Sequence, residues 1–80
     1  MKNLKRNEAR ILVYLENAKN VNRYAGYIAA KLSIDYAYVL QILKKMLVIG
    51  WIRTEQFAVK KYYFLTKKSP LEEAKDVLKK

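Results

Sequence analysis

One stretch of the sequence, residues 24–52, constrains the fold more than any other, because it contains two helical patterns separated by only a few residues. In the first pattern Tyr24, Ile28, Ala29 and Leu32 recur at the spacing of one helical face. The pattern breaks after Leu32, over the residues that precede the second one. We therefore predict a helix that is capped by Asn22 and ends near Leu32, followed by a tight turn.

The second pattern predicts a helix from Tyr36 to about Ile49. Asp35 is a suitable N-cap residue, because its carboxylate can accept a hydrogen bond from a free N–H of the first turn. Gly50 can adopt the positive φ that ends a helix. The expected buried stripe consists of Val39, Ile42, Leu43 and Met46. Two helices joined by such a turn, with Ile34 as its apolar anchor, form a helix-turn-helix, whose second helix can lie in the major groove of DNA.

A further helix is predicted before this stretch. From Glu8 onward the spacing is helical, with Asn7 as the cap, and the helix should end near residues 17–20, where two asparagines favour a turn. Its apolar face is formed by Ile11, Leu12, Leu15 and Ala18. Val21 is expected to form a short strand in the link to the next helix.

After Gly50 the apolar period changes from that of a helix to that of a strand. Residues 51–56 and 60–65 are rich in aromatic and β-branched types and predict a β-hairpin. The connection at residues 57–59 contains none of Gly, Pro, Asn or Asp, so the sequence leaves its turn type open. Ile52, Tyr63 and Leu65 should face the core, whereas Arg53 and one or both of Lys60 and Lys61 should face solvent or DNA.

A last helix is predicted from Pro70 to about Lys79. Ser69 at the N-cap, Pro70 in the first turn and Glu72 two residues later match a capping box. A helix of this length is marginal alone in water, so it must dock on its own domain or on a second copy. Its apolar side consists of Leu71, Ala74, Val77 and Leu78.

The order of these residues resembles the winged helix-turn-helix regulators of the MarR, ArsR and PadR kind, in their small prokaryotic or archaeal form. The resemblance covers roughly residues 9–66 and is carried by Ile28-Ala29, Leu32-Ser33-Ile34, Val39, Leu43, Met46, Gly50-Trp51-Ile52 and Tyr63-Phe64-Leu65-Thr66. It implies an α+β, mostly helical domain with a three-helix core, a two-stranded hairpin wing and an extra C-terminal helix. Residues 1–80 would then be one domain, with a basic arm at 1–7, the winged core at 8–66 and the last helix at 69–80.

The resemblance also implies a function. Such a protein would be a DNA-binding transcription regulator that reads the major groove with helix 36–49 and contacts the backbone or the minor groove with wing 51–65. The start of the recognition helix would lie near base edges, where Gln41 can form two hydrogen bonds to adenine, and the later lysines would meet phosphates. The full predicted DNA-binding set is Arg23, Tyr24, Tyr36, Ala37, Tyr38, Gln41, Lys44, Lys45, Arg53, Lys60 and Lys61.

Composition agrees with a nucleic-acid partner and argues against an enzyme. The net charge is +10, and the basic excess is spread along the chain, so the whole domain should attract polyanions. Because Cys and His are absent, the usual zinc ligand sets and a histidine acid–base site cannot be built. The acidic residues form no close catalytic pair, and no glycine-rich phosphate loop is present. We therefore expect no metal, cofactor or small-molecule ligand, no membrane span, and a cytoplasmic, nucleoid-associated protein.

Three questions stay open at the level of sequence. A chain of 80 residues buries a modest core, so we expect a homodimer, with Leu71, Ala74, Val77 and Leu78 as its interface. A second apolar stripe, Tyr36, Leu40, Leu43 and Leu47, is either covered within the chain or forms a partner interface. The alternatives to a regulator are a winged-helix protein-interaction module and a nonspecific nucleoid or RNA-binding protein.

Overall fold

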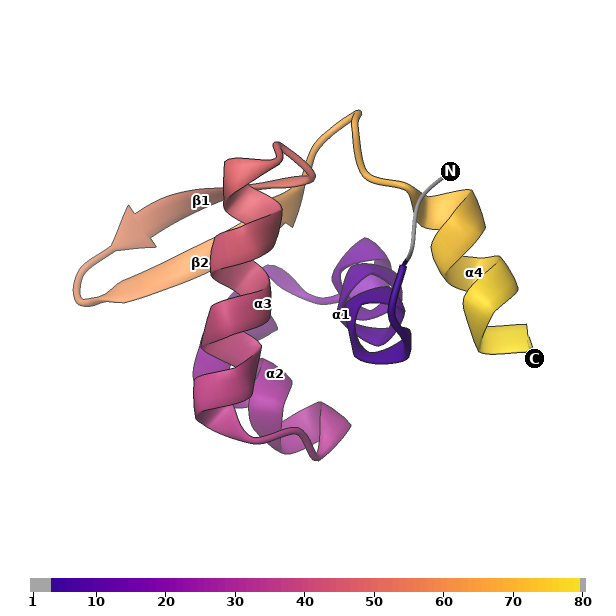
Figure 1. The fold of residues 1–80 in the computed structure, drawn as a ribbon. Coiled ribbons are helices and arrows are strands. Elements are labelled where there is room, and N and C mark those ends of the chain that lie inside the picture. The colour runs from indigo at the N-terminus through magenta and orange to yellow at the C-terminus, as the bar shows by residue number, and fades with distance from the viewer. Residues whose placement is uncertain (1–3, 80) are drawn as a thin grey trace.

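The computed structural model describes residues 4–79, so the first three residues of the predicted basic arm and Lys80 lie outside the described part. The elements follow the order α1, η1, α2, α3, β1, β2, α4, which confirms the predicted α+β, mostly helical winged helix-turn-helix (Figure 1). Their bounds are α1 Arg6–Asn17, the 3-10 turn η1 Asn20–Asn22, α2 Ala25–Leu32, α3 Tyr36–Val48, β1 Ile52–Phe57, β2 Lys60–Leu65 and α4 Leu71–Lys79.

Helix α1 forms the centre of the domain. It packs against α2, β2 and α4, and in Figure 1 it lies between α3 on one side and α4 on the other. Its side chains Ile11 and Leu12 are fully buried, and so is Met46 from the predicted stripe of α3. Burial of each of these apolar side chains contributes about 1.5–3 kcal/mol and holds α3 in a fixed position against the core.

The turn between α2 and α3 is built as predicted. Ser33 adopts a left-handed conformation with φ of 56°, which ends α2, and the Ile34 N–H donates to the Ala29 carbonyl at 3.0 Å. The Asp35 side chain then accepts a hydrogen bond from the Tyr38 N–H and caps α3. At the other end of α3, Gly50 has φ of 85°. Both ends of α3 are therefore set by local backbone chemistry.

The hairpin β1–β2 projects away from the helices (Figure 1). The strands are antiparallel, with Ile52 opposite Leu65 and Phe57 opposite Lys60, so the connection is a two-residue turn. Ala58 supplies the positive φ (56°) that such a turn needs, a position where glycine or asparagine is usual. With alanine at this position, the turn carries none of the residue types that mark a hairpin in a sequence.

The register divides the hairpin into two faces. Ile52 and Tyr63 are buried and, with Gln56 and Lys61, lie on the face turned toward the core and α3. The opposite face, which we call the outer wing face, consists of Arg53, Glu55, Phe57, Lys60, Tyr62 and Phe64, and Lys60 at its tip also reaches the Tyr24 ring.

The predicted start of α1 was wrong by two residues. The helix begins at Arg6 with Lys5 at the N-cap, and the Glu8 carboxylate accepts the Lys5 N–H at 3.0 Å. Asn7 lies inside the helix, where its side-chain oxygen accepts from Arg10 instead. The Glu8 carboxylate thus satisfies the N-cap N–H, which is the contribution of the N3 residue in a capping box.

The link between α1 and α2 also differs from its prediction. Val21 lies in η1, is 67% exposed and forms no strand. The N-cap of α2 is Tyr24, without a side-chain hydrogen bond, so Asn22 does not cap this helix. The place of a first strand is taken by a single hydrogen bond, from the Tyr63 N–H to the Arg23 carbonyl at 2.9 Å.

Helix α4 docks on α1 of its own chain. Ala74 is fully buried, and Leu71, Val77 and Leu78 are half-buried against the core. Lys75 adds an ion pair to Glu16 at 3.2 Å. The predicted capping box is absent, because the Ser69 hydroxyl donates to the Trp51 carbonyl and accepts from the Thr66 N–H, and the helix begins at Leu71.

Candidate nucleic-acid interface

The solvent-facing side of α3 is a row of four side chains, Ala37, Gln41, Lys44 and Val48, which we call the α3 ridge. All four are exposed, and their spacing (i, i+4, i+7, i+11) places them on one line along the helix. The buried stripe of Val39, Ile42, Leu43 and Met46 occupies the opposite side. The ridge is therefore the part of α3 that can enter a groove of another molecule.

The predicted second apolar stripe is split between core and surface. Leu43 is buried and Leu47 packs on the core, so these two are covered within the chain. Tyr36 and Leu40 are 54% and 38% exposed. The stripe therefore does not form one continuous partner surface.

A groove lies between the wing and α3 along this exposed flank, and we call it the wing groove. The Lys60 ammonium lies 4.0 Å above the centre of the Tyr24 ring, a cation–π contact that holds this lysine at the groove. Lys61 and Gln56 face each other across the hairpin and both line the groove. Its complete lining is Tyr24, Ala25, Gly26, Tyr36, Leu40, Gln56, Val59, Lys60, Lys61 and Tyr63.

A second hollow, which we call the Glu8 hollow, lies on the other flank of α3, against the start of α1. It is lined by Lys5, Glu8, Tyr38, Gln41, Ile42 and Lys45. Two lysines and a tyrosine hydroxyl thus border the α3 ridge on this side, as Lys60, Lys61 and Tyr36 do on the other. The ridge runs between two cationic hollows.

The carboxylate of Glu8 organises this second hollow. Its side chain is only 4% exposed, and it accepts hydrogen bonds from Lys45 Nζ at 2.7 Å and from the Lys5 N–H at 3.0 Å. Burial by itself raises the pKa of the Glu8 carboxyl, but these hydrogen bonds and the charges of the two lysines outweigh it, so the net pKa is lowered. Glu8 therefore stays ionised at neutral pH and fixes the Lys45 head group beside α3.

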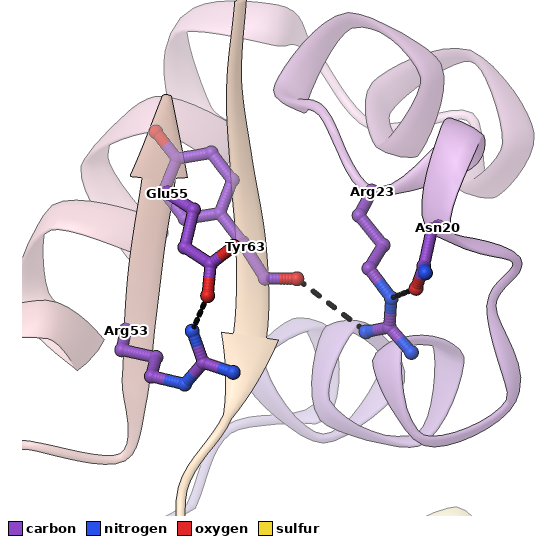
Figure 2. Close-up of polar contacts among 5 residues, drawn as sticks. All are labelled: Asn20, Arg23, Arg53, Glu55 and Tyr63. Carbon is purple, nitrogen blue, oxygen red and sulfur yellow. Dashed lines mark hydrogen bonds and ion pairs between the residues drawn. The ribbon is translucent and has the colours of Figure 1, made fainter. Parts of the chain in front are cut away.

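Arg23 is placed away from both hollows and serves the fold. Its guanidinium donates to the carbonyls of Leu15 at 2.8 Å and Ala18 at 3.0 Å, and more weakly to the Tyr63 carbonyl at 3.4 Å. Figure 2 shows it reaching from the η1 segment to Tyr63 on β2 and to the Asn20 side chain. Burial, the largest influence, lowers the pKa of this guanidinium. Because its donors are engaged by the chain itself, the geometry does not support the predicted DNA contact.

Arg53 is also separated from the α3 ridge. It lies on the outer wing face, forms an ion pair with Glu55 (Figure 2) and stacks over the Phe64 ring at 4.7 Å. Arg53 lies on the opposite face of the hairpin from Lys61 and lines neither the wing groove nor the hollow between α3 and α1. The structure thus gathers nine of the eleven predicted residues around α3 and leaves out Arg23 and Arg53.

Sequence reasoning missed several residues of this region. Lys5 and Glu8 were not identified, because a lysine at the N-cap lacks the Ser or Thr by which a capping box is recognised in a sequence. Gln56 and Val59 were missed because their place follows from the hairpin register. Val59 is 90% exposed at the wing tip, where it would be first to meet a bound molecule.

Residues 4–79 were predicted to contain neither a membrane span nor a metal site. Over residues 4–79 no helix has the length and apolar character to cross a membrane. Within the same residues no three acidic side chains lie close enough together to hold a metal ion.

No protein-family model matches the chain, and no curated protein matches it. Among solved structures, a variant of ZitR from Lactococcus lactis aligns over 96% of this chain and 52% of its own length, with a TM-score of 0.75 and 27% identity. AF1382 from Archaeoglobus fulgidus aligns over 92% of this chain and 78% of its own, with a TM-score of 0.68 and 24% identity. The chain therefore spans about half the length of ZitR, and these structures share its winged-helix fold.

Proposed function

We propose that this protein is a transcription regulator that binds double-stranded DNA, with α3 in the major groove and the β1–β2 wing on the backbone or in the adjacent minor groove. The observation that carries this proposal is the exposed α3 ridge between two cationic hollows. The net charge of +10 and the likeness to ZitR and AF1382 support it. Such a protein would act at the nucleoid and would need no catalytic group or cofactor.

The two hollows and the ridge would have different roles. Phosphate contacts fix the position of a protein on the duplex, whereas contacts to base edges give specificity. Lys60 and Lys61 on one flank, and Lys5 and Lys45 on the other, would meet the two phosphate backbones that border the groove. The ridge between them would meet the bases.

We also propose that two copies bind together. A dimer would place two α3 helices in successive major grooves about 34 Å apart and would favour a palindromic site. Ala74 is fully buried within its own chain. Of the predicted interface, only the half-buried Leu71, Val77 and Leu78 therefore retain exposed surface for such a contact. Sedimentation equilibrium with and without a palindromic duplex would measure the stoichiometry, and one copy per duplex would contradict the dimer.

The experiment that tests the function is fluorescence anisotropy with a labelled duplex from upstream of the protein's own gene, beside a shuffled duplex, across a salt series. Preference for the upstream duplex near physiological salt would support a regulator. Equal binding to both, lost steeply with salt, would replace the regulator by a nonspecific nucleoid or RNA-binding protein.

A second candidate function rests on the outer wing face. Phe57 and Val21 are 57% and 67% exposed and line one hollow together with Tyr62 and Phe64. Exposed apolar residues gathered in this way are typical of protein contacts. Absence of DNA binding even at low salt would favour a protein-interaction module that uses this face.

A further inference from the structure

The chemistry of the α3 ridge indicates which bases the protein reads. We infer that Ala37 and Gln41 together read A·T base pairs, with the Gln41 amide on adenine and the Ala37 methyl on the thymine methyl of a neighbouring pair. This inference rests on the proposed function, because it assumes that α3 enters the major groove.

The Gln41 side chain is free to make this contact. It is exposed at the centre of the ridge, and no hydrogen bond within residues 4–79 engages its amide. Gln56 differs, because its amide donates to the Ala58 carbonyl and is held at the wing tip. A glutamine amide matches the N6 donor and N7 acceptor of adenine with two hydrogen bonds.

Ala37 lies one helical turn before Gln41 on the same line. Four residues along a helix advance by about 6 Å, which is about the length of two base-pair steps in B-DNA. Because a helix in the groove is inclined to the DNA axis, this advance is an upper limit, and the two side chains reach base pairs that are at most about two steps apart. In the major groove the methyl group of alanine suits the C5-methyl of thymine, which no other base carries.

The remaining ridge residues do not favour G·C pairs at these positions. Arginine reads guanine and carboxylates read cytosine, and the ridge contains neither type. Lys44, a turn beyond Gln41, suits either guanine or phosphate. The first two turns of the ridge therefore carry only A·T-reading chemistry.

The flanking side chains position the ridge but add no base preference. Tyr36 and Tyr38 lie on opposite flanks of α3, beside the wing groove and the Glu8 hollow respectively. Their hydroxyls, with the lysines of the same hollows, suit phosphate oxygens. Specificity is thereby concentrated in two side chains that can be changed separately.

The test uses base analogues in a duplex selected from a random library by the wild-type protein. One derivative carries uracil in place of every thymine, which removes the methyl groups. Another carries 7-deazaadenine in place of every adenine, which removes the N7 acceptor. Affinities of the full chain are measured by anisotropy at one fixed salt concentration.

For the wild type we expect a loss of about fivefold or more with 7-deazaadenine and of about threefold with uracil. Gln41→Ala should lose its sensitivity to 7-deazaadenine, and Ala37→Ser its sensitivity to uracil. Lys44→Ala serves as the matched control, since it should bind every duplex more weakly and still respond to both analogues. Far-UV circular dichroism verifies that each variant is folded.

The possible failures are distinct. A wild type that binds the selected duplex but ignores both analogues overturns the A·T inference and leaves the proposed function standing. Analogue sensitivity that persists in Gln41→Ala and Ala37→Ser overturns the assignment to these residues. A wild type that selects no duplex at all overturns the proposed function itself.

Discussion

Replacing Arg23 by alanine distinguishes the DNA contact that the sequence predicts for this residue from the stabilising role that its hydrogen bonds indicate. In the structure its guanidinium joins the end of α1 to η1 and β2 through the carbonyls of Leu15, Ala18 and Tyr63. Arg23→Ala should therefore lower stability, with little direct effect on DNA affinity.

The magnitude follows from the geometry. Each hydrogen bond to a charged group contributes about 1.5–3 kcal/mol, but water can reach these carbonyls in part once the side chain is removed. Counting mainly the two short bonds, at 2.8 and 3.0 Å, gives an expected loss of about 2–4 kcal/mol. A domain of this size has a total free energy of unfolding of about 4–12 kcal/mol, so the loss is large.

The assay is urea unfolding followed by the fluorescence of Trp51, which is half-buried beside the hairpin. Lys19→Ala is the matched control, because it removes an exposed cation just before η1 and should change stability by less than about 0.5 kcal/mol. Arg23→Lys should be intermediate, since an ammonium cannot fork between two carbonyls as a guanidinium does. An Arg23→Ala protein as stable as wild type but deficient in DNA binding would refute this reasoning and restore the predicted DNA contact.

Three further predictions concern the Glu8 hollow, the turns and the ridge. Because the pKa of Glu8 is lowered in the folded state, its ionised carboxylate stabilises the fold above its ordinary pKa of 4.5, and this stabilisation is lost as the pH falls through the lowered pKa. Glu8→Gln should therefore lose less stability than wild type on acidification, as measured by urea unfolding between pH 3 and 6. Gly50 and Ala58 both have positive φ, so Gly50→Ala should lower stability by about 1–2 kcal/mol and Ala58→Gly should raise it by up to about 1 kcal/mol. Thermal unfolding measures both changes, and variants with the same midpoint as wild type would contradict backbone strain at these positions. Lys44→Ala should weaken binding to all duplexes and reduce the slope of log affinity against log salt by about 1, whereas an unchanged slope would remove Lys44 from the phosphate contacts.

The helices and strands were predictable where local chemistry decides them. Asp35 and Gly50 set the ends of α3, and their roles can be read from residue type alone. The hairpin follows from the change of apolar period after Gly50. The class of fold and the exposed side of α3 were therefore accessible from the sequence.

Two of the errors arose where a distant contact decides a local conformation. Ser69 has a good capping sequence around it, but the Trp51 carbonyl engages its hydroxyl. Val21 has the residue type of a strand, yet the Arg23 side chain and backbone make the link to β2. Such contacts join residues far apart in sequence, and no periodicity reveals them.

The candidate site shows the same division. The ridge residues Ala37 and Gln41 follow from helical spacing. The separation of Arg53 from Lys61 depends on the hairpin register, and the fixing of Lys45 depends on Glu8, 37 residues away. Residue type alone treats all these cations as equivalent.

The central claim is that DNA binds along the α3 ridge between the two hollows. The most direct measurement is the change in amide chemical shifts when isotope-labelled protein is titrated with the selected duplex. The largest changes are predicted at Ala37, Gln41, Lys44 and Lys61, with small changes at Val21 and along α4. Changes concentrated on the outer wing face, with the α3 amides unmoved, would contradict the claim.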